Sequence, residues 1–208
     1  MAHVSGALDG ALADATLISR VTIWLFSRLA FVYLAFVIFA LVSQAQTQDG
    51  GAPLTPERGV KAAYLYKFAG YVDWPAGTFP RADTPISISV AGDDQLADAL
   101  AQYVSSRTVD DRPLIVKKMK ADESLDGIHI LFIARGESAR LRTLGKSPGP
   151  TLVVTESEGT LSQGSAINFL ISGGRVRFEV ALENAEKRHL KLGSGLLRVA
   201  QNVRGGAP

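Results

Sequence analysis

Apolar and polar residues follow one another along residues 55–203 in patterns that predict alternating helices and strands. Residues 86–90 (ISISV) alternate strictly, which indicates a strand with one face in the core. Residues 128–134 (IHILFIA) are almost all apolar, which is typical of a strand that is buried on both faces. The other predicted strands are 113–119, 151–155 and the two arms of a hairpin, 166–171 and 175–180, around Ser172-Gly173-Gly174.

Apolar residues at helical spacing predict four helices. The first begins with Thr55-Pro56-Glu57, where Thr55 is a suitable cap and Pro56 and Glu57 suit the first turn. It is expected to end at Trp74-Pro75, because a proline ring disfavours helical geometry at the residue before it. The later helices are predicted at 92–104, 136–144 and 194–203. The stripe of the first helix that is predicted to face the core is Val60, Ala63, Tyr64, Phe68 and Tyr71.

This order of elements predicts an α/β fold, a three-layer sandwich in which helices flank a mixed β-sheet. We expect a single compact domain over residues 57–204 and a short disordered tail at 205–208. Residues 46–56 (QTQDGGAPLTP) are polar and contain Gly and Pro, as expected of a flexible linker.

The N-terminal segment has the pattern of a secretory signal peptide over residues 1–45. An uncharged apolar run extends from Leu29 to Val42 directly after Arg28, and Ser43-Gln44-Ala45 places small residues where a signal peptidase reads them. The predicted cleavage site lies between Ala45 and Gln46, and the remaining domain is expected in the periplasm.

A retained membrane anchor is the alternative interpretation of the same segment. Counted from Val21 to Val42, the apolar stretch is long enough to cross a hydrocarbon core of roughly 30 Å. Arg28 interrupts this stretch, however, and a charge within a membrane span is costly. The domain would then touch the membrane only through its uncleaved N-terminal segment.

The charge balance and the absence of cysteine exclude several classes of function. The chain has 22 Lys and Arg against 20 Asp and Glu, a net charge of +2, whereas a nucleic-acid partner requires a strongly basic face. Since there is no cysteine, thiolate metal sites and cysteine nucleophiles are excluded. The core must also be stable without the disulfides that exported domains often use.

No set of residues forms a convincing catalytic, metal or cofactor site. His129 lies inside an apolar strand, which predicts a neutral, hydrogen-bonded core histidine, and His189 lies at a helix end among basic residues. Asp93-Asp94 and Asp110-Asp111 are interpreted as a helix start and a turn, rather than as metal ligands. We therefore expect a protein that is not an enzyme and that has no metal and no cofactor.

Aromatic side chains are concentrated in residues 64–79. Tyr66 and Trp74 fall outside the apolar stripe of the first helix, and Phe79 follows shortly after them. Because amphipathic aromatic residues are favoured anchors at interfaces, Tyr66, Trp74 and Phe79 are candidate partner-binding residues. Core packing is the alternative role for the aromatic residues of this segment.

A ligand crevice is a second candidate site. In open α/β sheets, ligands bind beyond the carboxyl ends of the strands, and Asp93, Asp94 and Arg135 each follow a predicted apolar strand. These residues would support the alternative function, a periplasmic solute-binding sensor module that serves a membrane kinase or transport system.

Three segments resemble one known family in the same order. Residues 60–75 (VKAAYLYKFAGYVDWP) are similar to the opening helix of YfiR-like periplasmic proteins. Residues 166–180 resemble the hairpin of that family, and residues 185–200 resemble its closing segment. The positions that carry the resemblance are Lys61, Tyr64, Phe68, Trp74, Pro75, Asn168, Phe169, Phe178, Leu190, Leu196 and Leu197.

The resemblance implies a compact α/β domain without catalytic activity that is often a homodimer. The best-known member represses an inner-membrane diguanylate cyclase by binding its periplasmic sensor region, and an outer-membrane lipoprotein sequesters this repressor. Loss of the restraint raises cyclic di-GMP and favours biofilm. That member depends on disulfides, whereas this chain has no cysteine.

Overall fold

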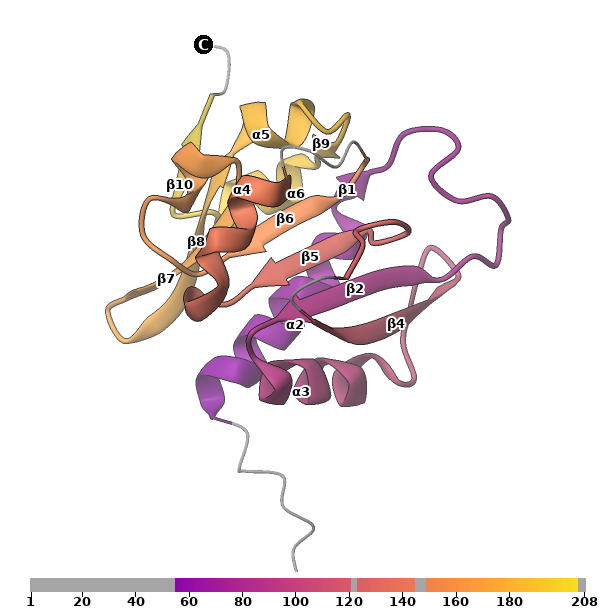
Figure 1. The fold of residues 1–208 in the computed structure, drawn as a ribbon, viewed down its shortest axis with the longest axis horizontal. Coiled ribbons are helices and arrows are strands. Elements are labelled where there is room, and N and C mark those ends of the chain that lie inside the picture. The colour runs from indigo at the N-terminus through magenta and orange to yellow at the C-terminus, as the bar shows by residue number, and fades with distance from the viewer. Residues whose placement is uncertain (1–54, 121–122, 145–148, 206–208) are drawn as a thin grey trace, which may run out of the picture. The chain divides into compact units, whose positions relative to one another are not determined.

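The computed structural model describes residues 55–120, 123–144 and 149–205 (Figure 1). The predicted signal peptide, its cleavage site at Ala45 and Gln46, and most of the predicted linker lie outside the described residues. The described residues form a mixed eight-stranded sheet, with the strand order β10-β8-β7-β6-β5-β2-β4-β3, and a separate pair, β1 and β9. This arrangement confirms the predicted mixed-sheet α/β class, while the division into three layers stays a prediction.

The bounds of the elements follow the hydrophobic pattern closely in the middle of the chain. The strands are β1 (Val72–Asp73), β2 (Ile86–Ala91), β3 (Thr108–Val109), β4 (Arg112–Met119), β5 (Ile130–Ile133), β6 (Leu152–Thr155), β7 (Ile167–Ser172), β8 (Arg175–Ala181), β9 (Lys191–Leu192) and β10 (Asn202–Arg204). The helices are α2 (Pro56–Gly70), α3 (Asp94–Val104), α4 (Leu141–Leu144), α5 (Leu182–Glu186) and α6 (Ser194–Val199), with 3₁₀ turns η1 (Arg135–Arg140) and η2 (Thr160–Gln163).

The centre of the sheet is parallel and contains a change of winding direction. Strand β2 pairs in parallel with β4 on one side and with β5 on the other, and β5, β6 and β7 continue in parallel. The chain therefore leaves β2 toward one edge and later returns to its other side. The carboxyl ends of β2 and β5, where the crevice was predicted, consequently lie next to each other.

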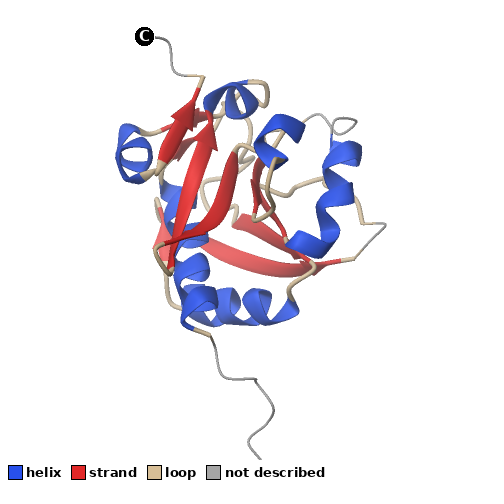
Figure 2. Cartoon of the chain, turned by 90° about the vertical axis from the view of Figure 1, so that its left-hand side faces the viewer, coloured by secondary structure: helices blue, strands red, loops and turns tan. Residues whose placement is uncertain are grey.

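Both faces of the central strands are covered, as the apolar run 128–134 predicts. Ile130 and Phe132 of β5 belong to the main core, together with residues of α2 and α3. Leu131 and Ile133 belong to a second cluster that includes Leu141, at the start of α4. Figure 2 shows the twisted sheet surrounded by helices.

Helix α2 confirms the predicted start but corrects both its end and its buried face. It ends at Gly70, because Val72 and Asp73 leave the helix to pair with Leu192 and Lys191 of β9. Val60 and Tyr71, expected in the core, are 41% and 42% exposed. The buried residues of α2 are Lys61, Ala62, Leu65, Phe68 and Ala69.

The predicted hairpin is confirmed and the last helix is corrected. Strands β7 and β8 pair antiparallel from Ile167 with Val180 to Ser172 with Arg175, around Gly173 and Gly174, both with positive φ. The last helix ends at Val199 instead of residue 203. Its continuation was wrong because Asn202 to Arg204 form β10, which pairs in parallel with β8.

Candidate functional site

Two side chains from the first two turns of α2, Arg58 and Lys61, form ion pairs at the strand ends where the ligand crevice was predicted. Asp93, directly after β2, accepts a hydrogen bond from the backbone N–H of Leu96 at 3.0 Å and so caps α3. The same carboxylate forms an ion pair with Arg58 of α2, with 3.1 Å between Nε and Oδ2. Asp93 is therefore occupied by partners within the protein.

The other two crevice residues have different positions. Asp94 is exposed, and its Oδ2 lies 4.0 Å from the Nζ of Lys118 in β4. Arg135 is exposed, and its backbone N–H donates to Glu156 at 3.1 Å. The structure thus places Asp93 and Arg135 at neighbouring strand ends, where the Asp93 carboxylate and the Arg135 backbone N–H both bond to groups within the domain.

Lys61 joins α2 to the end of β6, a contact that sequence reasoning missed. Its ammonium lies 2.5 Å from both Glu57, one turn earlier, and Glu156, directly after β6. Burial lowers the pKa of Lys61, but the hydrogen bonds that its ammonium donates to Glu156 and Glu57 outweigh burial and raise the pKa above the usual 10.5. No sequence signal pointed to this contact, because the predicted core stripe of the helix did not include Lys61.

The three aromatic candidates are half-buried and each packs within the domain. The hydroxyl of Tyr66 donates to the Thr108 carbonyl at 3.0 Å. The indole N–H of Trp74 donates to the Ala69 carbonyl at 3.4 Å, and the Trp74 ring meets that of Phe79 edge-on, with 6.0 Å between centroids. The structure brings Trp74 and Phe79 together, and Tyr66 lies apart from them against Tyr103.

His129 connects this aromatic pair to the sheet. Its ring stacks on Phe79 with 4.7 Å between centroids, and its Nδ1 accepts the backbone N–H of Ser87 at 2.9 Å. Desolvation by burial is the main reason why the pKa of His129 lies below its usual 6.5, and the charge of Arg112 lowers it further. The predicted neutral, hydrogen-bonded core histidine is confirmed.

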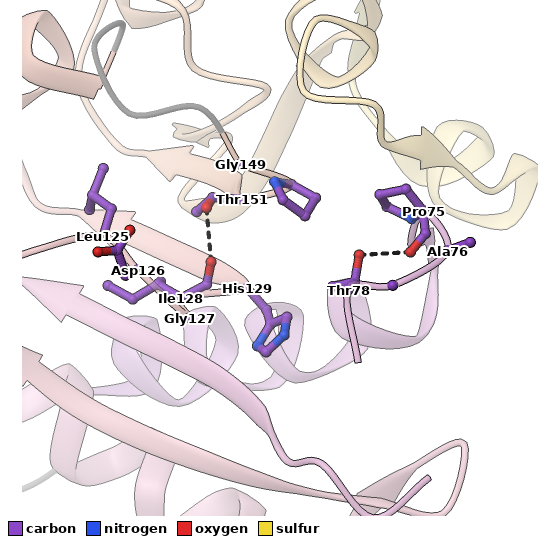
Figure 3. A pocket seen from close by; sticks show the side chains of 12 residues that line it. Pro75, Ala76, Thr78, Leu125, Asp126, Gly127, Ile128, His129, Gly149 and Thr151 are labelled. Atoms are coloured by element: carbon purple, nitrogen blue, oxygen red, sulfur yellow. Dashed lines mark hydrogen bonds between the residues drawn. The ribbon is translucent and has the colours of Figure 1, made fainter. Parts of the chain in front are cut away.

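A cavity of about 440 Å³ lies beside His129, at the amino ends of β5 and β6. In Figure 3, Pro75, Ala76 and Thr78 lie on one side of the cavity and Leu125 and Asp126 on the other, with Thr151 between the two groups. Thr151 donates to the Ile128 carbonyl at 2.8 Å. Asp126, an exposed acidic residue, is among those that line the cavity, which is large enough for a small molecule.

A second hollow lies on the outer face of α2. Cavities of about 400 and 390 Å³ share Pro56, Val60 and Tyr64, and one of them reaches the turn of the β7–β8 hairpin. Sequence reasoning assigned Val60 to the core and so did not identify this surface. We call it the α2–hairpin groove; its lining residues are Pro56, Glu57, Gly59, Val60, Ala63, Tyr64, Lys67, Ile171, Gly174, Arg175, Val176 and Arg177.

The positions that carry the family resemblance meet in the core. Tyr64 and Phe68 of α2 contact the rings of Phe169 and Phe178 in the hairpin, with centroids 5.1–5.9 Å apart. Leu190 and Leu196 are 1% exposed, so the closing segment packs in the same core. The three motif segments therefore form one structural unit.

Asn168, the polar member of the hairpin motif, has a structural role. Its Oδ1 accepts hydrogen bonds from Thr155 at 2.9 Å and Thr160 at 3.0 Å, and its Nδ2 donates to Glu179 at 3.2 Å. The residue is 3% exposed, so these bonds satisfy an amide that would otherwise be costly to bury. Asn168 thereby fixes β6, η2 and β8 relative to one another.

Within residues 55–120, 123–144 and 149–205, no three acidic, histidine or cysteine side chains are placed to hold a metal ion. The same part of the chain contains no helix that is long and apolar enough to cross a membrane.

The fold and these surfaces define a mixed α/β domain whose polar groups at the strand ends are joined by internal ion pairs. Residues 58–201 match the DUF4154 family, described as YfiR/HmsC-like. The chain belongs to this family, which confirms the resemblance. No curated protein matches the chain significantly.

Proposed function

We propose that the protein is a non-catalytic periplasmic regulator that restrains an inner-membrane diguanylate cyclase by binding its periplasmic sensor region. Membership of the YfiR/HmsC-like family over residues 58–201 carries this proposal. The predicted signal peptide supports it, because cleavage between Ala45 and Gln46 would release a domain that can diffuse between the two membranes. A homodimer and an outer-membrane lipoprotein that sequesters the regulator belong to the same proposal.

A deletion strain tests the regulatory role. Removing the gene should raise cellular cyclic di-GMP and surface attachment, and expression of the full chain from a plasmid should restore both. The nucleotide is measured by mass spectrometry and attachment by dye staining. Unchanged cyclic di-GMP and attachment in the deletion strain would refute the restraint of a cyclase.

The candidate contacts Tyr66, Trp74 and Phe79 can be tested in the same strain. Trp74→Ala should fail to restore low cyclic di-GMP if the indole contacts the partner. Because Trp74 also packs against Phe79 and His129, the thermal midpoint of the purified variant must be measured in parallel. A large drop of the midpoint would assign Trp74 to the core instead.

A solute-binding sensor module is the second candidate function, and the cavity beside His129 favours it. Its volume of about 440 Å³ lies in the range of small-molecule sites. A thermal-shift screen of periplasmic metabolites tests this function, since a ligand that binds only the folded state raises the midpoint saturably. Asp126→Asn should weaken the binding of any cationic ligand found in this way. A screen in which no metabolite raises the thermal midpoint would count against a solute-binding function.

A further inference from the structure

The α2–hairpin groove leaves apolar side chains open to solvent. Val60 is 41% exposed and Ile171 is 53% exposed, whereas Val176, the strand partner of Ile171, is 8% exposed. Ile171 lies on the same face of the hairpin as the buried Phe169, but at the end that α2 does not cover. Tyrosine is enriched among the residues that anchor interfaces, so Tyr64 beside the exposed Val60 and Ile171 makes the groove a candidate docking surface.

The charges around the groove have one dominant sign. Lys67 of α2 lines it, and Arg175 and Arg177 of β8 border it, with their side chains on the strand face opposite to that of Val176. None of the three forms an ion pair with a side chain in the described part of the protein. The only acidic side chain that lines the groove among the described residues, Glu57, is already paired with Lys61 at 2.5 Å. An occupant that supplies carboxylates would therefore complement the groove.

A second copy of the chain would complement it poorly. In a two-fold symmetric dimer centred on this groove, the same residues face each other across the axis. Arg175 and Arg177 of the two copies would then lie close together, and like charges at an interface are unfavourable. The charge pattern favours a different, acidic occupant.

We propose that the α2–hairpin groove binds a short acidic segment of the signalling partner, in which an aromatic or aliphatic side chain is flanked by Asp or Glu. The apolar side chain would lie between Val60, Tyr64 and Ile171. The carboxylates would pair with Lys67, or with Arg175 or Arg177 around the end of the hairpin. This proposal rests on the proposed function and assigns the surface that the regulated protein contacts.

Synthetic peptides test the chemistry of the groove. The full chain is titrated into three fluorescein-labelled peptides of equal length, and binding is followed by fluorescence anisotropy. The first peptide has a Phe and a Leu flanked by Asp and Glu, the second replaces the acids by Lys, and the third replaces Phe and Leu by Ser. Only the first should bind saturably, and moderate salt should weaken it.

Variants place the binding site on the protein. Ile171→Asp and Arg177→Glu should each weaken the first peptide by about tenfold, which corresponds to about 1.4 kcal/mol. Ile115→Asp and Lys117→Glu, on the exposed face of β4, are matched controls and should bind like the unchanged protein. Thermal midpoints equal to that of the unchanged protein show that the variants are folded. If Ile171→Asp does not fold, Arg177→Glu alone tests the groove.

Three results would overturn the proposal: no saturable binding of the acidic peptide, equal binding of the Lys peptide, or binding that the groove variants do not change. Light scattering that shows a dimer broken by Ile171→Asp would assign the groove to a second copy instead. In cells, the Ile171→Asp or Arg177→Glu chain is expressed in the deletion strain. If it restores low cyclic di-GMP, the groove is not the contact surface, but the regulatory function stands. A deletion strain with unchanged cyclic di-GMP refutes the regulatory function itself.

Discussion

Lys61 carries a charge into the domain because two carboxylates from different parts of the chain surround it. Its side chain is 8% exposed, and Glu156, 95 residues further along, is 16% exposed. Removing one member of a buried pair leaves the other as an unpaired charge. The main energetic effect of the pair is therefore the cost of leaving one charge buried and unpaired when the other is removed, rather than the attraction between the two charges.

Lys61→Ala should destabilise the domain by about 3 kcal/mol, measured as the free energy of unfolding in urea. Lys118→Ala, which removes an exposed ion pair with Asp98, is the matched control and should leave the urea midpoint almost unchanged. Since the pKa of Lys61 is raised, its contribution is complete below about pH 10.5 and is lost at more alkaline pH. Equal stability of both variants would contradict the buried-pair account.

His129 should make stability depend on pH in the opposite range. Its lowered pKa means that the folded state holds the neutral ring, so its contribution is complete above the ordinary pKa of 6.5. As the pH falls below 6.5, the unfolded chain takes up the proton first, and stability declines through the pKa of the folded state. Urea unfolding at about pH 7.5 and about pH 5 measures this decline.

His129→Gln supplies the control for that experiment. A glutamine keeps an acceptor near the Ser87 N–H but cannot be protonated, so the variant should lose less stability than the unchanged protein over the same pH range. A decline of the same size in both proteins would show that other groups cause the pH dependence.

At the scale of elements, the β7–β8 hairpin shows how local chemistry sets a surface. Gly173 and Gly174 have φ of 56° and 70°, a conformation that costs a residue with a side chain about 1–2 kcal/mol. Their turn holds Ser172 opposite Arg175, which places Ile171 at the groove and Arg175 and Arg177 on the other face of the hairpin. The turn therefore sets the geometry of the docking surface.

Gly174→Val should lower the free energy of unfolding by at least about 1 kcal/mol, because a branched side chain is unfavourable at positive φ. Gly173→Asn should change stability little, since asparagine tolerates this conformation and is common in such turns. Both values come from chemical denaturation. If Gly173→Asn were as harmful as Gly174→Val, loss of glycine itself, and not the backbone angle, would be the cause.

The same elements show what the sequence could predict. The hairpin, β2 and α3 follow from signals within a few residues: two glycines, strict alternation, and Asp93 as a cap. The end of the last helix depends on β8, a strand that lies earlier in the sequence. The backbone N–H of Gln201 donates to the Phe178 carbonyl at 2.8 Å, and Asn202 then pairs with Glu179. The apolar pattern near Val203 was compatible with a helix, and only the tertiary pairing decides against it.

At the scale of the whole molecule, the positions of the crevice residues were predictable but their partners were not. Asp93 and Arg135 follow parallel strands, so their meeting at one edge could be inferred from strand order. That Arg58 and Lys61 would approach this edge required the packing of α2 across the sheet. The groove was missed for the same reason, since the periodicity of α2 does not reveal which face the hairpin covers.

The contacts of α2 also determine when the domain can complete its folding. This helix is the first of the described elements to emerge from the ribosome, and under the proposed export it would also be the first of them to leave the membrane. Glu156, which pairs with the ammonium of Lys61, is synthesised 95 residues after that lysine. Phe169 and Phe178, which contact Phe68, follow later still. Contacts between residues so far apart slow folding. Until the hairpin arrives, the apolar face of α2 has no partner, and exposed apolar surface of this kind makes an unfinished chain prone to aggregation.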